Sequence, residues 1–193
     1  MPSSSLDMKI ENDRLFVVDD QGQLSVYQLE QKKNCHRIEQ SVITQGLLLS
    51  VSVRQGQIAT SSSVGSISVI DGATMKETDW LPCHDDAEAW IVTIGPSGQL
   101  FTGGDDSYFR IWDLKSHEAI IEKKFMAGQT SCEWHSENEN LLVQGGYDDT
   151  IRLWDLRQMT RPLSEQVLKG GVWRTRFNGR HVLVPCMYEN GTG

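Results

Sequence analysis

Residues 140–157 read NLLVQGGYDDTIRLWDLR, and the pattern of this stretch decides the fold of the chain. Its first apolar run is Leu-Leu-Val at 141–143, and its second places Ile151, Leu153 and Trp154 around polar residues. Between them stands Gly-Gly-Tyr-Asp-Asp, which has the composition of a turn. Two apolar runs of strand length that flank a turn predict a β-hairpin. The pair Trp154-Asp155 ends its second strand.

The same pattern recurs along the chain at a nearly constant interval. Trp112 lies 42 residues before Trp154, Ile70 lies 42 residues before Trp112, and Tyr27 lies 43 residues before Ile70. A Gly-rich turn followed by Trp-Asp, repeated at such a period, is typical of WD-repeat β-propellers, in which each unit forms a four-stranded blade. The sequence therefore predicts an all-β WD-repeat propeller.

The repeat gives about four and a half blades. The predicted units cover approximately residues 6–40, 47–81, 89–125 and 130–168, with an incomplete unit at 171–193. A propeller ring normally closes by pairing its first and last blades, which leaves no exposed sheet edge. Because half a blade is left over, we expect an incomplete ring, as in a truncated gene product, a shortened isoform or a cloned fragment.

Composition narrows the class of protein. No apolar run approaches the ~20 residues that cross a bilayer, and the N-terminus lacks the pattern of a signal peptide. The four cysteines are far apart and form no metal-binding or disulfide pattern, which favours a cytoplasmic protein without a metal or other cofactor. The net charge of −8 argues against direct nucleic-acid binding. It is compatible with a basic partner, and a surface that keeps the protein in solution is the more common reason for such a charge.

Several residues have a predicted structural role. An Asp six residues before each repeat Trp can accept backbone hydrogen bonds and hold the turn, whereas Gln21 and Val64 stand at this place in the first two units, whose turns we expect to be looser. The two repeat tryptophans are expected to pack between blades, and the Asp after each to stabilise the strand end. The predicted structural residues are Asp106, Trp112, Asp113, Asp148, Trp154 and Asp155.

Residues outside this framework carry more functional information. They are His84, Glu88, Trp90, Asp105, Trp173 and Arg174. Trp90 and Trp173 stand at or near the start of predicted innermost strands, close to the central channel and one rim, where propellers bind ligands. Ordinary packing is the alternative role for both tryptophans, and a solvated loop is the alternative for His84, since Asp85 and Asp86 follow it.

These motifs together resemble the WD-repeat enzymes of diphthamide biosynthesis, the diphthine methylesterases, which an older name calls diphthine methyltransferases. The resemblance rests on Glu-Ala-Trp-Ile at 88–91, Gly-Gly-Asp-Asp at 103–106, Gly-Tyr-Asp-Asp at 146–149, and Gly-Gly-Val-Trp-Arg at 170–174. It runs from about Leu6 to Gly191. Two departures are that Lys-Phe-Met-Ala-Gly at 124–128 stands where the family usually has a His, and that the family continues beyond residue 193.

The resemblance implies hydrolysis of the methyl ester of methylated diphthine, a modified histidine of translation elongation factor 2. It also implies other diphthamide-pathway proteins as partners. No G-x-S-x-G or HExxH motif supplies a nucleophile or metal site. His84 or Glu88 could instead activate water, and Arg174 could stabilise the oxyanion. Trp90, Trp173 and Asp105 could bind the trimethylammonium group of diphthine. The alternative function is a non-catalytic WD-repeat scaffold or inactive fragment that binds protein partners.

Overall fold

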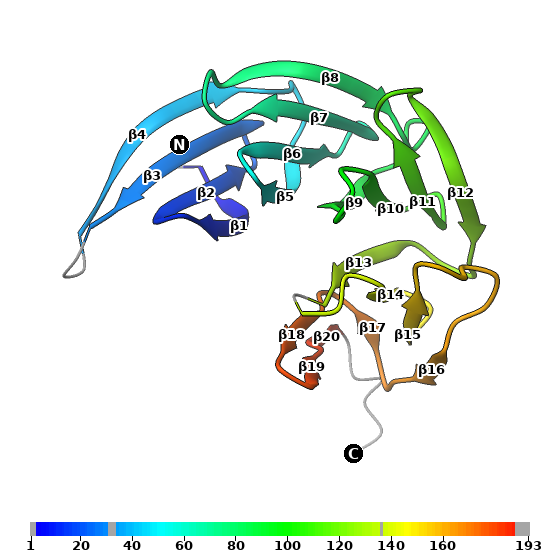
Figure 1. The fold of residues 1–193 in the computed structure, drawn as a ribbon. Coiled ribbons are helices and arrows are strands. Elements are labelled where there is room, and N and C mark those ends of the chain that lie inside the picture. The colour runs from blue at the N-terminus through cyan, green and yellow to red at the C-terminus, as the bar shows by residue number, and fades with distance from the viewer. Residues whose placement is uncertain (1–2, 31–33, 136, 188–193) are drawn as a thin grey trace.

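The computed structural model describes residues 3–30, 34–135 and 137–187. In this part of the chain, four-stranded antiparallel sheets follow one another along an arc, with the first strand of each sheet innermost (Figure 1). The predicted all-β propeller architecture is confirmed. Residues 188–193, which include Tyr188 and the end of the predicted fifth unit, lie outside the described residues.

Four blades are simple up-and-down sheets. The first contains β1 (Ser5–Glu11), β2 (Arg14–Asp19), β3 (Gln23–Leu29) and β4 (Cys35–Val42). The second contains β5 (Leu48–Arg54), β6 (Gln57–Ser62), β7 (Ser66–Asp71) and β8 (Lys76–Pro82). The third contains β9 (Ala89–Ile94), β10 (Leu100–Gly104), β11 (Tyr108–Asp113) and β12 (Glu118–Lys124). The fourth contains β13 (Gln129–Trp134), β14 (Leu141–Gly146), β15 (Thr150–Asp155) and β16 (Ser164–Val167).

The fifth unit is an interrupted hairpin. Its short strands are β17 (Gly171–Val172), β18 (Arg176–Asn178), β19 (His181–Leu183) and β20 (Cys186–Met187). β18 pairs with β19 around Gly179, whose φ of 58° suits glycine in a tight turn. β17 pairs with β20, and the Trp173 amide donates to Pro185 O at 3.0 Å between the two pairings. Residues 173–175 therefore separate β17 from β18.

The apolar core is divided among the seams between blades. The seam between the first two blades contains Phe16, Val18, Leu24, Val26, Leu48, Val51, Ile58 and Ile70. The next contains Ala59, Ile67, Val69, Leu81, Cys83, Ala89, Val92, Ile94 and Leu100. The third contains Ile91, Phe101, Phe109, Ile111, Cys132, Leu142, Trp154 and Met159. Each seam thus buries the facing sides of two adjacent blades, which makes the blade the repeating unit of stability.

The apolar residues of β1 face away from the second blade. Leu6, Met8 and Ile10 are 39%, 55% and 66% exposed, while the polar residues between them are half-buried. Within the described residues, no blade covers the apolar side of β1. The described blades accordingly form an open arc and not a closed ring (Figure 1).

The turns in the first two blades are not looser than the others. The Gly22 amide donates to Asp19 O at 3.3 Å and the Gly65 amide to Ser62 O at 3.2 Å, as Ser107 does to Gly104 O in the third blade. Side chains earlier in each turn supply the further acceptors. The Asp19 carboxylate accepts from the Gln21 and Gln23 amides, and Ser62 Oγ accepts from the Ser66 amide. The expectation of looser turns was wrong, because it considered only the residue six positions before the repeat Trp as a side-chain acceptor.

Candidate functional site

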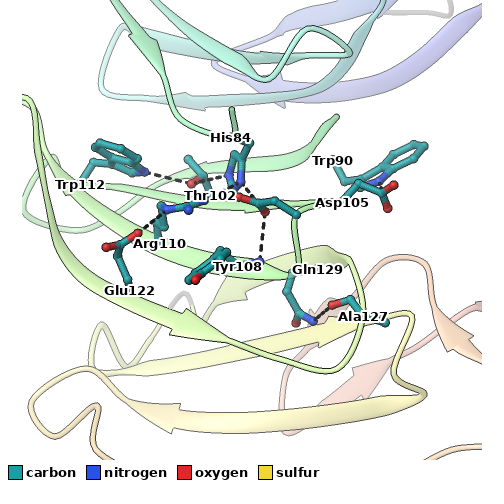
Figure 2. A network of polar contacts seen from close by, with 11 residues as sticks. His84, Trp90, Thr102, Asp105, Tyr108, Arg110, Trp112, Glu122, Ala127 and Gln129 are labelled. Atoms are coloured by element: carbon teal, nitrogen blue, oxygen red, sulfur yellow. Dashed lines mark hydrogen bonds and ion pairs between the residues drawn. The ribbon is translucent and has the colours of Figure 1, made fainter. Parts of the chain in front are cut away.

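A chain of buried polar contacts crosses the third blade (Figure 2). Trp112 Nε1 donates to Thr102 Oγ1 at 3.0 Å, and Thr102 Oγ1 lies 2.9 Å from His84 Nε2. On the other side of the ring, His84 Nδ1 lies 2.9 Å from Asp106 Oδ1. With the proton assigned to Nδ1, each group donates to the next, from the indole to the carboxylate. The network ties the loop before β9 to β10 and β11.

This geometry corrects the expectation for His84. The side chain is fully buried, so the solvated-loop interpretation is wrong. Both ring nitrogens are also within hydrogen-bond distance of protein atoms, which leaves neither of them for a substrate water. His84 therefore holds the blade together, and we do not assign it a role as general base. Gly104 provides the space for it, because a Cβ at that residue would lie 2.5 Å from His84 Nδ1.

Asp106 is the charged end of this network. Burial alone would raise the pKa of its carboxyl, but hydrogen bonds from His84 and Arg110 outweigh burial and hold the pKa at about 2. Arg110 Nη1 lies 2.5 Å from Asp106 Oδ2, and Arg110 Nε donates to Glu122 Oε2 at 2.7 Å. Asp106 also accepts from the Tyr108 amide at 3.1 Å, which is the turn contact that the sequence suggested.

The fourth blade builds an equivalent chain without a histidine. Trp154 Nε1 donates to Gln144 Oε1 at 3.3 Å, Gln144 Nε2 donates to Gln129 Oε1, and Gln129 Nε2 donates to Ala127 O at 2.7 Å. Asp148 pairs with Arg152 at 2.6 Å and accepts from the Thr150 amide. Two glutamines therefore take the place that Thr102 and His84 have in the third blade.

In the second blade, only the threonine of the third-blade network has an equivalent. Thr60 lies 42 residues before Thr102, and Ile70 stands at the place of Trp112. Thr60 Oγ1 is buried and has no hydrogen-bond partner among the described residues. A buried hydroxyl without a partner costs stability, since it has lost its hydrogen bonds to water.

The two equivalent threonines make a matched pair for mutation. Thr102→Val should lower the free energy of unfolding by about 1–3 kcal/mol, because it removes the hydrogen-bond partner of both Trp112 Nε1 and His84 Nε2. Thr60→Val should be neutral or stabilising, because it replaces an unsatisfied hydroxyl with a methyl group. Urea denaturation of both variants tests this difference, and equal losses of stability would show that the Thr102 network contributes nothing specific.

An aromatic cluster lies at the rim formed by the third, fourth and fifth units. The Trp90 ring contacts Trp173 edge-on, with centroids 5.5 Å apart, and Tyr147 at 6.1 Å. Trp90 Nε1 donates to Asp105 Oδ1 at 3.3 Å, and Asp105 is exposed. The structure thus brings together the three predicted substrate-binding residues, Trp90, Asp105 and Trp173, from separate turns and strands. The three rings are half-buried.

Tyr147 is the member of the cluster that sequence reasoning did not select. It stands 42 residues after Asp105, so the same turn position carries a carboxylate in one blade and a phenol in the next. The difference between Asp105 and Tyr147 at equivalent positions of the repeat could have indicated that Tyr147 has a role outside the framework. Gly128 and Gly171 allow the surrounding loops to approach, because a Cβ on either would lie within 3.2 Å of the Tyr147 ring.

Arg174 connects the cluster to the inner strands. Its Nη1 donates to Thr130 O at 2.9 Å and to Trp173 O at 3.1 Å, and its Nη2 donates to Leu49 O at 3.2 Å. The guanidinium also lies over the Trp173 ring, 4.8 Å from the centroid. Burial lowers the pKa of Arg174. Since these carbonyl oxygens engage the terminal nitrogens, the geometry favours a positioning role over the proposed oxyanion contact.

The remaining predicted residues take separate places. Glu88 is half-buried beside the cluster, and its carbonyl oxygen accepts from the Asp105 amide at 2.9 Å. Trp112 packs in the seam between the second and third blades, and Trp154 lies in the next seam. Asp113 accepts from the Ser116 amide and hydroxyl after β11. Asp155 pairs with Arg157 at 2.7 Å, which lowers the pKa of its carboxyl to about 2.

Within residues 3–30, 34–135 and 137–187, no group of three or more His, Cys, Asp or Glu side chains is arranged to hold a metal ion. Over the same ranges, no helix is long and apolar enough to cross a membrane.

The repeat and the fold both have known counterparts. Residues 75–113 and 123–155 match the family described as WD domain, G-beta repeat. The first match starts at β8, the outer strand of the second blade, and ends with β11 of the third, so the sequence repeat links adjacent blades. A chain in the structure titled "Crystal Structure of Mitotic Checkpoint Complex" superposes with a TM-score of 0.82 at 19% identity, covering 95% of this chain and 58% of that one.

Curated relatives match over longer stretches. A Dictyostelium discoideum protein named diphthine methyltransferase homolog is 30% identical over 96% of this chain, which spans 59% of that protein's length. The human protein named diphthine methyltransferase is 28% identical over 53% of this chain, and the match covers 24% of its length. The chain therefore carries WD repeats, and over almost its whole length it is similar to one curated protein named diphthine methyltransferase homolog.

Proposed function

We propose that this chain acts in diphthamide biosynthesis and hydrolyses the methyl ester of methylated diphthine on translation elongation factor 2. The names of its relatives support the pathway. The observation that carries the finer assignment is the cluster of Trp90, Trp173 and Tyr147 beside the exposed carboxylate of Asp105. A translation factor as substrate also places the proposed activity in the cytoplasm.

The cluster suits a quaternary ammonium group. Trimethylammonium binds the faces of aromatic rings, with ~0.5–2 kcal/mol for each such contact. Arg174 already lies over the Trp173 ring, so we assign the main contact to Trp90. The Asp105 carboxylate, hydrogen-bonded to Trp90 Nε1, adds attraction for the cation. Asp85 and Asp86 are exposed on the neighbouring loop and add negative charge to the same rim.

Ester hydrolysis requires an activated water molecule near this cluster. We assign proton abstraction from that water to Glu88, which immediately precedes the strand that carries Trp90. Attack on the ester carbonyl then releases methanol and leaves the free carboxylate. Arg174 would fix the Trp173 ring and so orient the bound substrate, because its contacts with Leu49, Thr130 and Trp173 hold it in place.

The test is incubation of the purified chain with elongation factor 2 that carries methylated diphthine, followed by mass spectrometry of the modified peptide. We expect conversion of the methyl ester to the acid, at a rate that falls about 100-fold or more in Glu88→Gln. Glu118→Gln is the matched control, since Glu118 is exposed at the start of β12. Equal activity in both variants would remove Glu88 from the mechanism.

A scaffold function is the second candidate, and one observation favours it. Met126 is 92% exposed in the loop where the resemblance leads one to expect a histidine. Gly128 in the same loop adjoins Asp105 and Tyr147. An exposed apolar side chain beside the aromatic cluster suits contact with a protein partner. Binding of the modified factor without loss of the ester would identify this function.

A further inference from the structure

A second place in the molecule has the features of a binding site. The inner strands β1, β5, β9 and β13, together with Arg176, enclose a cavity of about 300 Å³ in the central channel. Three carboxylates and three cations line it, and these are Asp7, Glu11, Glu133, Lys9, Arg54 and Arg176. The cavity is lined by different residues from the aromatic cluster, so its ligand is independent of the proposed esterase activity.

The carboxylates of the cavity already have donors from the protein. Asp7 Oδ2 accepts from Ser50 Oγ at 3.0 Å and from the Val51 amide at 3.1 Å. Glu11 Oε1 accepts from the Gln55 amide at 3.1 Å. Glu133 Oε2 accepts from the Phe177 amide at 3.1 Å. Each carboxylate is therefore held in place by at least one backbone amide.

The cations are less well matched. Lys9 Nζ and Arg176 Nη1 share the carboxylate of Glu133, at 3.7 Å and 3.8 Å, which are long distances for ion pairs, and Arg176 Nη1 also donates to Thr175 O at 3.1 Å. Burial lowers the pKa of Lys9, and the charge of Arg176 lowers it further. Arg54 stacks on Trp134 at 4.1 Å and its Nη2 pairs with Glu139 at 3.2 Å, whereas its buried Nε has no partner among the described residues. The spare hydrogen-bonding capacity of the lining is thus mostly donor capacity.

We propose that this cavity binds a small oxyanion, of the carboxylate or phosphate class, between Lys9 and Arg176. Such an anion supplies a further negatively charged acceptor to the two cations that share Glu133, and it reduces the repulsion between them. The Glu133 carboxylate already pairs with Lys9 and Arg176, so it competes with the anion for these two cations. Removal of its charge should therefore strengthen binding, whereas loss of Lys9 should weaken it.

The experiment follows the melting temperature of the whole chain during titration with sodium phosphate, and separately with sodium acetate, at ionic strength fixed with sodium chloride. We expect a saturable rise of about 3–5 °C at a tenfold excess over the dissociation constant. The rise should disappear in Lys9→Met and persist in Lys115→Met, because Lys115 is exposed and lies outside the cavity. A response to phosphate alone or to acetate alone identifies the class of ligand.

Glu133→Gln provides the opposing test. The amide keeps an acceptor for Phe177 but removes the competing charge, so we expect phosphate or acetate to bind roughly threefold or more tightly. Lys9 acylation followed by peptide mass spectrometry gives a readout independent of stability, and the bound anion should protect this lysine. The proposal is overturned by a linear response without saturation, by equal responses in Lys9→Met and Lys115→Met, or by weaker binding in Glu133→Gln.

Discussion

Replacement of His84 with alanine is expected to lower the free energy of unfolding by about 3–4 kcal/mol. The imidazole is fully buried, so its loss leaves a cavity between β10 and the loop before β9. It also removes the hydrogen-bond partners of Asp106 and Thr102. The charged end of the network should suffer most, because Asp106 then keeps Arg110 but loses the imidazole beside it.

A surface histidine in a similar pair is the control for this prediction. His117 Nε2 lies 2.9 Å from Asp79 Oδ1, but the His117 side chain is 55% exposed. An exposed pair of this kind contributes below ~1 kcal/mol, so His117→Ala should unfold at nearly the urea concentration of the unsubstituted chain. Urea denaturation followed by tryptophan fluorescence compares the two variants. Similar midpoints for His84→Ala and His117→Ala would contradict the structural role of the buried network.

Replacement of Trp90 with alanine should weaken binding of methylated diphthine by about 10-fold to 30-fold. The indole contacts both other rings of the cluster and donates to Asp105, so it lies at the centre of the proposed cation site. Trp90→Phe should retain part of the affinity, because it keeps an aromatic face while losing the hydrogen bond to Asp105. Titration of the chain with elongation factor 2 that carries methylated diphthine measures the effect.

Trp80→Ala is the control for Trp90→Ala, because it removes a tryptophan outside the proposed binding site for methylated diphthine. Trp80 is 56% exposed on the outer strand β8, away from the inner-strand end that carries Trp90. This variant should bind the modified factor as the unsubstituted chain does. Each variant's unfolding midpoint must be measured alongside, since Trp90 is half-buried. A folded Trp90→Ala chain with unchanged affinity would exclude the cation–π assignment.

The blade pattern was predictable because it depends on local sequence. Apolar alternation, Gly-rich turns and the 42-residue interval indicated the strands, and the interval also exposed Trp112 and Trp154 as equivalent residues. The polar networks were not predictable in the same way, because each joins residues from different strands and loops. His84 looked exposed beside Asp85 and Asp86, yet its ring turns inward to Thr102 and Asp106.

The candidate site was predictable in part for the same reason. Trp90, Asp105 and Trp173 stood out as departures from the repeat, and a propeller brings such departures together at one rim. The role of Arg174 depended on where its guanidinium points, which the sequence does not encode locally. Its contacts with Leu49 and Thr130 span the inner strands of the second and fourth blades. Tyr147 was not selected, because it belongs to the Gly-Tyr-Asp-Asp turn at 146–149, a motif that WD repeats share in general.

The most direct test of the proposed recognition is a comparison of two affinities. The chain is titrated with elongation factor 2 that carries methylated diphthine and with the same factor bearing the unmodified histidine. We predict tighter binding of the modified factor by about 10-fold or more, and loss of this preference in both Trp90→Ala and Trp173→Ala. Equal affinity of the unsubstituted, folded chain for the two forms of the factor would contradict the account.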